Sequence, residues 1–233
     1  IYVACQNGTI YAYEISGKPL SQWTTKQSVF GIDQPFIPIR HNNTDYIYGY
    51  GNRNQYIIDR KGKIVKLKSP ESEIKKAIAA FSDSGRKCML YILDASGSLY
   101  SIDPAKATEI NALNLSDTLT DISSYGDLLN DKIVLLSRNK LYDYFTTNEI
   151  KLITEIQPDE KLQFVNQINF PDRAGMTDKN QNKFYLLSTT SAIEDGYPVW
   201  GSSDFSLMKN DDNTAKSYIV ISDSNGVLYV YSE

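Results

Sequence analysis

The residues that most often carry out catalysis are scarce in this chain of 233 amino acids. The sequence has one histidine, His41, which lies in a polar run that we predict to form a turn, so a hydrolytic triad has a single candidate base. The two cysteines, Cys5 and Cys88, lack the C-x-x-C spacing of a metal or redox site. We predict that they are buried thiols in strands of different repeat units, without a disulfide. The sequence contains no G-x-S-x-G elbow, H-E-x-x-H pair or phosphate-binding P-loop.

Oxygen ligands for a metal ion are the remaining chemical candidate. The run Asn210–Asn213 resembles the start of a calcium loop, but the alternation of ligands then breaks and no glycine makes the turn. The chain has 28 Asp and Glu residues, and no pair among them stands out as a glycosidase pair. The sequence therefore predicts no catalytic, cofactor-binding or metal-binding residue, and no cofactor.

The charge of the chain argues against nucleic acid and membrane partners. Lys and Arg number 24 against 28 Asp and Glu, a net charge of −4. The one basic stretch, from Arg60 to Lys76, contains the partly alternating run Ile64–Lys68. We interpret this run as an edge strand that its lysines protect from aggregation. No stretch of 18 apolar residues is present, so we predict no direct membrane insertion.

The dominant pattern is a tyrosine that recurs after a turn residue. The six tyrosines of this series are Tyr11, Tyr56, Tyr100, Tyr142, Tyr185 and Tyr229. The intervals between them are 45, 44, 42, 43 and 44 residues, and they cover the whole chain. A nearly constant period of this length is typical of solenoids and propellers.

Each tyrosine follows an apolar run and a tight polar turn, which is a hairpin signature. Further strands precede and follow the hairpins, and four antiparallel strands per repeat match a propeller blade. The sequence predicts an all-β propeller of six four-stranded blades, with seven or eight blades as alternatives. A β-sandwich would not repeat one motif at a fixed spacing, and a helical solenoid needs a 3.6-residue period. Only Glu71–Ala80 has helix-forming composition; we predict a helical turn in its first half and an inner strand in its second.

We expect one propeller domain over residues 1–233, with blade units at approximately 1–24, 35–68, 76–113, 121–156, 163–200 and 205–233. The first unit contains predicted strands at Ile1–Cys5, Ile10–Ile15 and Pro19–Trp23, and it lacks an innermost strand. The last unit lacks an outermost strand. We therefore expect about two strands from upstream sequence and a chain that belongs to a longer protein.

The run Gly8–Trp23 resembles the repeat of the quinoprotein-like β-propellers, a superfamily of PQQ-type and WD-like repeats. That repeat reads roughly G-x-hydrophobic-Y-A-hydrophobic-D-x-x-T-G-K-x-x-W; here Glu14 replaces the Asp and Ser16 replaces the Thr. The final unit is similar to the same superfamily and to the integrin-type FG-GAP repeat, whereas the middle units are degenerate. The resemblance implies that Trp23 and Trp200 lock neighbouring blades together, and it does not imply quinone binding. Many such propellers are non-enzymatic assembly modules of the cell envelope, which implies an extracytoplasmic location.

We interpret the six recurring tyrosines as structural anchors between blades, with hydroxyl groups that reach water or backbone. The sequence then favours a non-catalytic scaffold or binding module for a protein partner or a neighbouring domain of the same chain. The candidate contact loops are Lys26–Gln34, Asp195–Tyr197 and the turns between second and third strands. The alternative is a carbohydrate-active or quinone-type enzyme, which needs carboxylates that converge on the propeller face.

Overall fold

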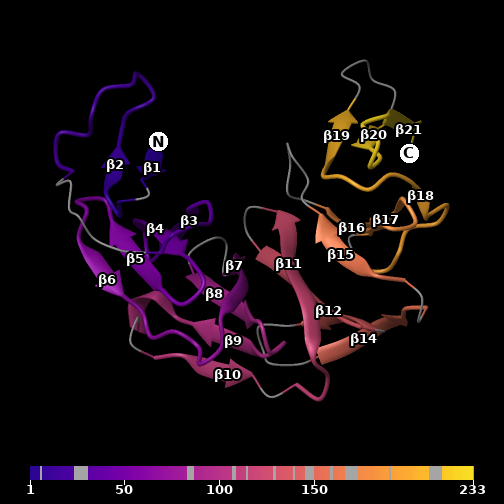
Figure 1. Ribbon diagram of the computed structural model, residues 1–233, viewed down its shortest axis with the longest axis horizontal. Coiled ribbons are helices and arrows are strands. Elements are labelled where there is room, and N and C mark those ends of the chain that lie inside the picture. The colour runs from indigo at the N-terminus through magenta and orange to yellow at the C-terminus, as the bar shows by residue number, and fades with distance from the viewer. Residues whose placement is uncertain are drawn as a thin grey trace. The chain divides into compact units, whose positions relative to one another are not determined.

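The computed structural model describes residues 1–5, 7–23, 31–82, 87–106, 109–113, 115–127, 130–138, 140–144, 150–157, 160–165, 173–188, 190–209 and 217–232. The chain divides into two compact units, Ile1–Ser116 and Asp117–Glu233. Each unit contains three sheets, whose strands pair antiparallel with their neighbours in sequence (Figure 1).

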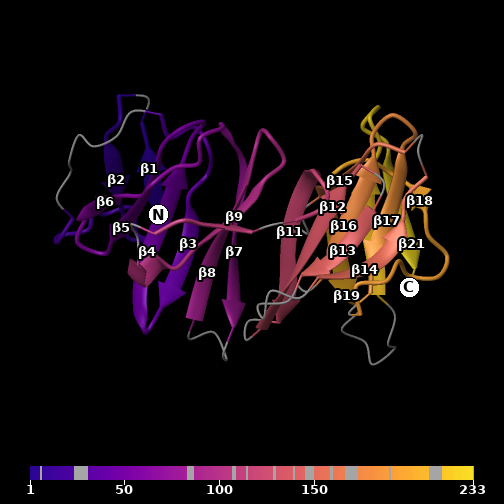
Figure 2. The ribbon, with the colours of Figure 1, turned by 90° about the horizontal axis from the view of Figure 1, so that it is seen from below.

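Unit 1 contains a two-stranded sheet followed by two four-stranded sheets. Their strands, in order, are β1 (Tyr2–Ala4) and β2 (Ile10–Ala12); β3 (Ile37–His41), β4 (Thr44–Tyr50), β5 (Gln55–Asp59) and β6 (Ile64–Lys66); β7 (Ile74–Ser82), β8 (Lys87–Asp94), β9 (Leu99–Ile102) and β10 (Asn111–Leu113). A short 3-10 helix, η1 (Pro104–Lys106), precedes β10. The strands of unit 1 are seen from a second direction in Figure 2.

Unit 2 contains two four-stranded sheets and a three-stranded sheet. Their strands, in order, are β11 (Leu119–Asp127), β12 (Asn130–Ser137), β13 (Lys140–Tyr144) and β14 (Ile150–Glu155); β15 (Leu162–Val165), β16 (Ala174–Asp178), β17 (Lys183–Leu187) and β18 (Val199–Trp200); β19 (Phe205–Lys209), β20 (Ser217–Ser222) and β21 (Leu228–Ser232). Among the described residues, the first sheet has two strands where the sequence predicted three, and the last sheet has the three strands that were predicted.

An aspartate three residues before a glycine shapes several of the turns. In the turn after β8, Asp94 Oδ1 accepts hydrogen bonds of 2.9 Å from the N–H groups of both Ser96 and Ser98, and Gly97 has φ +84°. The turns that begin at Asp59 and Asp223 repeat these side-chain hydrogen bonds. Glycine is required at the fourth position because it takes a positive φ without a steric clash. The Asp thus satisfies turn N–H groups that a tight hairpin would otherwise leave without a partner.

The cores lie between neighbouring sheets within each unit. In unit 1, Ile10 of the first sheet packs with Ile47 and Ile58 of the second, and a larger cluster joins the second sheet to the third. In unit 2, one cluster lies between the first two sheets and another, around Phe184 and Phe205, lies between the last two. Each inner sheet therefore buries apolar side chains on both faces, which explains the continuous apolar runs in its second and third strands.

The structure corrects the prediction for His41. It is the last residue of β3, 9% exposed, and its Nδ1 lies 3.2 Å from the Cys88 carbonyl oxygen. Asn42 and Asn43 form the turn on their own, because both take the positive φ that a two-residue hairpin loop needs. His41 therefore stays in the sheet and contacts the next sheet.

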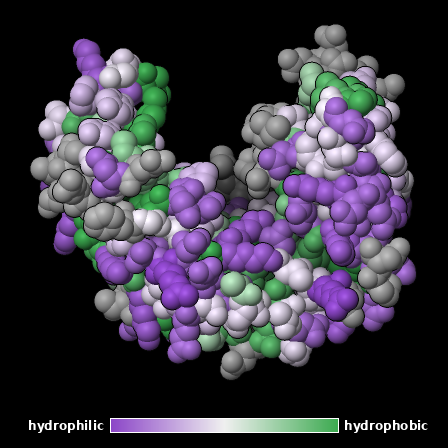
Figure 3. Space-filling model, viewed as in Figure 1, coloured by the Kyte–Doolittle hydropathy of each residue, from purple (hydrophilic) through white to green (hydrophobic). Residues whose placement is uncertain are grey.

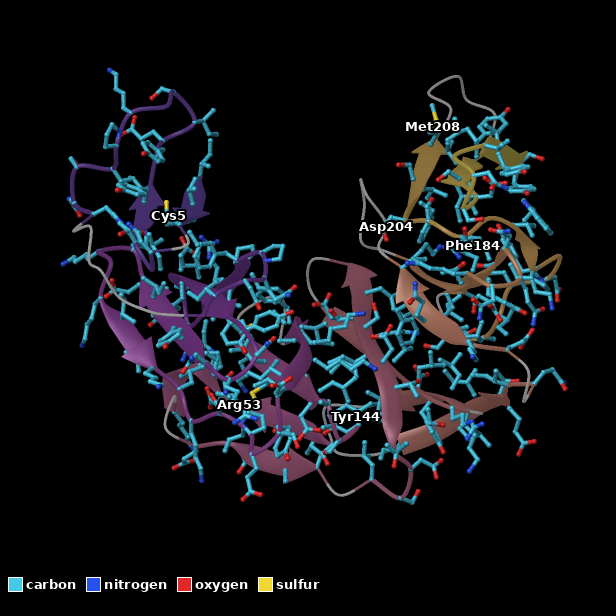
Figure 4. The ribbon with its side chains drawn as sticks, in the orientation of Figure 1. Cys5, Arg53, Tyr144, Phe184, Asp204 and Met208 are labelled. Atoms are coloured by element: carbon cyan, nitrogen blue, oxygen red, sulfur yellow. The ribbon has the colours of Figure 1, made fainter. Side chains whose placement is uncertain are left out.

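Three local predictions also need correction. The stretch before β7 forms no helical turn, because the N–H of Ile74 donates to Asn52 O over 2.6 Å and Glu73 O accepts from Ala95 N over 2.7 Å. Cys88 is buried on β8 as predicted, but Cys5 lies just past β1 and is only half-buried (Figure 4). The expected strand 19–23 makes only an isolated bridge at Pro19, which lacks an N–H, and the chain then turns.

The buried hydrogen bond between Tyr48 and Gln55 provides a test of the core of unit 1. Both side chains are 0% exposed, and the Tyr48 hydroxyl donates to Gln55 Oε1 over 2.6 Å. We expect Tyr48→Phe to lower the free energy of unfolding by about 1–3 kcal/mol, because Gln55 Oε1 is left buried without its donor. The control is Tyr231→Phe, which removes an exposed hydroxyl hydrogen bond to Trp200 O and is expected to cost less than about 1 kcal/mol. If urea unfolding shows the same loss of unfolding free energy for Tyr48→Phe and Tyr231→Phe, the prediction is contradicted.

Candidate functional site

An apolar groove lies beside β1 in unit 1. The groove has a volume of about 650 Å³ and is lined by Tyr2, Val3, Ala4, Ile32, Asp33, Gln34, Pro35, Phe36, Pro38 and Ile47. Its base is Ile47, which is 4% exposed and belongs to the core between the first two sheets. Hydrophobic surface is visible at the end of unit 1 that carries β1 and β2 (Figure 3). The groove therefore continues the core of unit 1 out to the surface.

Two glycines of the second sheet allow the segment 31–36 to form one wall of this groove. A Cβ at Gly49 would lie 2.7 Å from Phe36 Cε1 and 3.0 Å from Ile32 Cδ1, so both side chains can rest on β4 only because Gly49 has none. A Cβ at Gly51 would lie 1.6 Å from the Gly31 carbonyl oxygen, so the backbones meet there. These close approaches hold the wall against the second sheet.

The groove is nearly without charge. Among the residues that line it, Asp33 is the one member of the Asp, Glu, Lys, Arg and His types, and its side chain is exposed. Asp33 to Gln34 also belong to the loop Lys26–Gln34 that we expected to make contacts, although residues 24–30 lie outside the described part of the chain. An apolar surface with a single carboxylate at its rim suits a peptide or protein surface better than a charged metabolite.

Five of the six predicted tyrosine anchors lie on the third strand of their sheet, and Tyr11 lies on β2 of the two-stranded sheet. Several of their hydroxyl groups have different partners from those expected. In four of the six, the hydroxyl donates to a carboxylate of the same sheet: Tyr100 to Asp94, Tyr142 to Asp117, Tyr185 to Glu160 and Tyr229 to Asp223. We had predicted water or backbone as the acceptor. The signal for two of these acids was present in the sequence, since Asp94 and Asp223 each stand three residues before a glycine.

The other two pairs form a repeated three-residue cluster in unit 2. Lys140 and Tyr142 contact Asp117, and Lys183 and Tyr185 contact Glu160 in the same arrangement 43 residues later. Hydrogen bonds from the Tyr142 hydroxyl, and then from Lys140, hold the pKa of Asp117 below its ordinary value of 3.8. Each acid lies two residues before the first strand of its sheet, so the cluster ties the start of that sheet to its third strand.

The turn aspartate Asp223 has its pKa set by opposing causes. Burial acts to raise the pKa, but the N–H groups of Val227 and Asn225, Trp200 Nε1 and the Tyr229 hydroxyl outweigh it and leave the pKa below the ordinary value. The contact from Trp200 comes from β18, the last strand of the neighbouring sheet, over 3.5 Å. Burial also raises the pKa of Tyr125, to about 12, where its hydroxyl donates to Ser191 Oγ.

The remaining predicted anchors are Trp23, Tyr11 and Tyr56. Trp23 Nε1 donates to Ile10 O over 2.9 Å, and its ring lies 5.5 Å from that of Tyr2. Tyr11 is 39% exposed and stacks on Tyr13, whereas Tyr56 is 6% exposed on β5. The eight predicted anchor residues are thus distributed over six sheets and do not converge on one site.

The last sheet has one uncovered apolar face in unit 2. Phe205, Leu207 and Ile219 point into the core, while the alternate positions leave Met208 56%, Leu228 65% and Val230 59% exposed. Met208 extends from β19 away from this core (Figure 4). The strand register places these side chains on one face, because positions two residues apart share a face.

Other predicted positions add no further chemistry. The calcium candidate Asn210–Asn213 lies outside the described residues. The described part of the chain contains no group of three His, Cys, Asp or Glu side chains placed to hold a metal ion.

The turn Asp195–Tyr197, one of the predicted contact loops, lies in unit 2 with Gly196 at φ +86°. Lys66 lies on β6, the outer strand of its sheet, in agreement with the edge-strand interpretation of the basic stretch. Within the described ranges, no helix is long and apolar enough to cross a membrane.

Comparison with solved structures identifies the fold. BBS1N in complex with ARL6DN superposes with a TM-score of 0.63 at 16% identity, over 100% of this chain and 72% of that one. Virginiamycin B lyase from Staphylococcus aureus superposes with a TM-score of 0.61 at 12% identity, over 99% of this chain and 79% of that one. Dihydro-heme d1 dehydrogenase NirN in complex with DHE superposes with a TM-score of 0.62 at 12% identity, over 100% of this chain and 51% of that one. No protein-family model matches the chain, and no curated protein matches its sequence.

The chain therefore has the all-β fold of the β-propellers, as its sequence predicted. Its structural neighbours include both a propeller in a protein complex and enzymes. At identities of 12–16% the likeness establishes the fold and carries no activity with it.

The Asp117 cluster makes the stability of unit 2 depend on pH. Because the folded-state pKa of Asp117 is lowered, its contribution is present above the unfolded-state value of 3.8 and is lost as the pH falls through the folded-state pKa. We expect Asp117→Asn to destabilise the protein above about pH 4 and to approach wild-type stability at lower pH. Tyr142→Phe, which keeps Lys140, should show the same trend with a smaller amplitude. Urea unfolding between about pH 2 and pH 7 is the measurement, and a difference that does not change with pH would contradict the prediction.

Proposed function

We propose that this chain is a non-catalytic β-propeller module that binds a protein partner through the groove beside β1. The observation that carries the proposal is an apolar groove of about 650 Å³ whose lining includes a single carboxylate, that of Asp33. Burial of apolar surface is the main driving force of protein association, and the centres of interfaces are depleted of charge. The groove meets both conditions.

The comparisons support this proposal at the level of the fold. A propeller neighbour, BBS1N, is found in a complex with another protein, ARL6DN. A propeller presents rigid strands and exposed loops, so a binding surface requires little ordering when a partner arrives. The partner proposed for this chain is a protein or a neighbouring domain with an apolar contact surface.

We further propose that the six sheets are six blades of one propeller domain spanning residues 1–233. The coverage of 100% of this chain by BBS1N supports this view, as does the nearly constant spacing of the six tyrosines. The quinoprotein type of the repeat and the extracytoplasmic location stay predictions from the resemblance of Gly8–Trp23.

A charge placed in the groove tests the proposed function. Pro38 is exposed on β3 and lines the groove, so Pro38→Glu puts a second carboxylate near Asp33 with little effect on the core. We expect this change to weaken partner binding at least tenfold, about 1.4 kcal/mol, because the charge loses water when the groove is covered. The matched control is Val65→Glu on β6, the opposite edge of the same sheet, where Val65 is 36% exposed.

The measurement is affinity capture with wild type and both variants, followed by the dissociation constant of each recovered partner with purified proteins. A partner that binds Val65→Glu like wild type and loses affinity for Pro38→Glu supports the proposal. Partners that bind all three proteins equally would contradict it. Turnover of a carbohydrate or a quinone-linked substrate by the purified chain would instead favour the enzyme alternative.

A further inference from the structure

We propose that the outer edge of the second sheet of unit 1 binds an acidic segment of a protein partner, which pairs with β6 as a further strand. β6 is the last of the four strands of this sheet (Figure 1), whereas Pro38 of β3, at the opposite edge, lines the groove. The inference therefore goes beyond the proposed function and concerns a second surface. It is supported by the charge of residues 60–68, by the backbone groups of β6 and by the outer strands of the other sheets.

A run of positive charge includes β6 and the turn before it. Residues 60–68 contain five Lys or Arg residues and no Asp or Glu. Arg60 has an acidic neighbour, because its Nη1 lies 3.9 Å from Asp45 Oδ2. Within the described part of the chain, no ion pair involves Lys63, Lys66 or Lys68, and all three are exposed. These three charges can therefore pair with carboxylates of another molecule.

The outer strands of the other four-stranded sheets differ from β6 in charge. Three lysines and no acid lie within two residues of β6, whereas no Lys or Arg lies within two residues of β10 or β18. The corresponding stretch around β14 has one lysine and two glutamates. All four strands are edges of their sheets, so a need to prevent aggregation applies to each of them. The lysines of β6 therefore indicate a more specific role: they repel a second copy of the same edge and attract an acidic strand.

The backbone of β6 has a row of hydrogen-bonding groups that faces away from β5. The carbonyl oxygen of Lys63 and the N–H of Leu67 both bond to β5, over 3.0 Å and 2.9 Å. In an antiparallel pair this direction alternates along the strand, so the N–H and C=O groups of Ile64 and Lys66 face outward. Among the described residues, no strand pairs with this side of β6. An added strand can therefore bond to both residues.

The side chains along this edge specify which segment fits. Residues two apart in an extended chain share a face, so Lys66 and Lys68 lie on one face and Val65 lies on the other. Val65 is 36% exposed, and Leu67 on the same face is buried in the core toward the third sheet. The added strand therefore needs acidic residues at alternate positions, opposite the lysines, and β-branched residues between them, opposite Val65.

The probe is the synthetic peptide Glu-Thr-Glu-Val-Glu-Thr-Glu, titrated into the isotope-labelled chain and followed by NMR. The control peptide Glu-Glu-Glu-Glu-Thr-Val-Thr has the same composition and charge without the alternation. We expect the control to bind at least about threefold more weakly, because its carboxylates cannot all face the lysines of a paired strand. Equal affinities of the two peptides would overturn the inference, since charge alone would then account for binding.

A charge reversal on β6 tests the contribution of its lysines. We expect Lys66→Glu to weaken binding of the probe about fivefold, because an attractive cross-strand pair becomes a repulsive one. The matched control is Lys151→Glu, which makes the same change at an exposed position of the outer strand β14 and is expected to bind within about twofold of wild type. Equal losses in the two variants would show that only net charge matters and would overturn the inference.

Amide hydrogen exchange of the wild-type protein provides a measurement that needs no variant. Saturating probe is expected to slow exchange at Ile64 and Lys66 at least about fivefold, while the amide of Val65, which faces β5, changes little. Protection that is absent, or equal at all three amides, would overturn strand addition.

Different variants test the groove and the edge at β6. Pro38→Glu is expected to bind the probe within about twofold of wild type, because it leaves β6 unchanged. A captured protein that loses affinity for Lys66→Glu and not for Pro38→Glu supports the inference and leaves the groove proposal to its own test.

Two further outcomes would overturn the inference alone. The first is a wild-type chain that does not bind the probe at about 5 mM, in which case the capture experiment still tests the groove. The second is a single-stranded oligonucleotide or a vesicle of anionic lipid that binds β6 more tightly than the probe, because the basic edge would then recognise a different class of polyanion.

Discussion

The pairing of backbone hydrogen-bond groups between neighbouring strands is the constraint on which the rest of this structure depends. An inner strand has both rows of N–H and C=O groups satisfied by its neighbours, whereas an edge strand leaves one row open. Pro38 interrupts the inner edge of the second sheet, and Lys66 lies on its outer edge. The apolar groove lies between Pro38 of this sheet and β1 of the first sheet, both of which line it. The candidate site therefore lies where the first two sheets of unit 1 meet, above the core residue Ile47.

Carboxylates stabilise the sheets at the ends of their strands. An aspartate such as Asp94 accepts two turn N–H groups with one oxygen and the hydroxyl of Tyr100 with the other, so one side chain joins a turn to the strand that follows it. The clusters at Asp117 and Glu160 use a tyrosine and a lysine for a comparable purpose. These acids serve the fold and lie outside the lining of the groove.

The fold could be predicted from the sequence because its signals are local and repeated. Tyr100 and Tyr229 each follow a four-residue turn that begins with Asp and ends with Gly, and such turns place the next strand antiparallel to the last. The prediction for His41 failed because its polar neighbours indicate a turn, while its burial depends on contact with Cys88, 47 residues away. The acceptor of the Tyr142 hydroxyl was missed for the same reason, since Asp117 is 25 residues distant and comes close only when the strands pair in register.

The sequence by itself determined the all-β repeat, the positions of the hairpins and the incomplete first and last sheets, because strand periodicity and turn chemistry act over a few residues. Only the tertiary structure decided where the groove lies and what lines it. Its wall depends on the close approach of Gly31 to Gly51 and of Phe36 to Gly49, and the residues of β1 that also line it lie more than 25 positions away in the sequence. Such contacts join residues that are distant in sequence, and they exist only after the sheets have packed against one another.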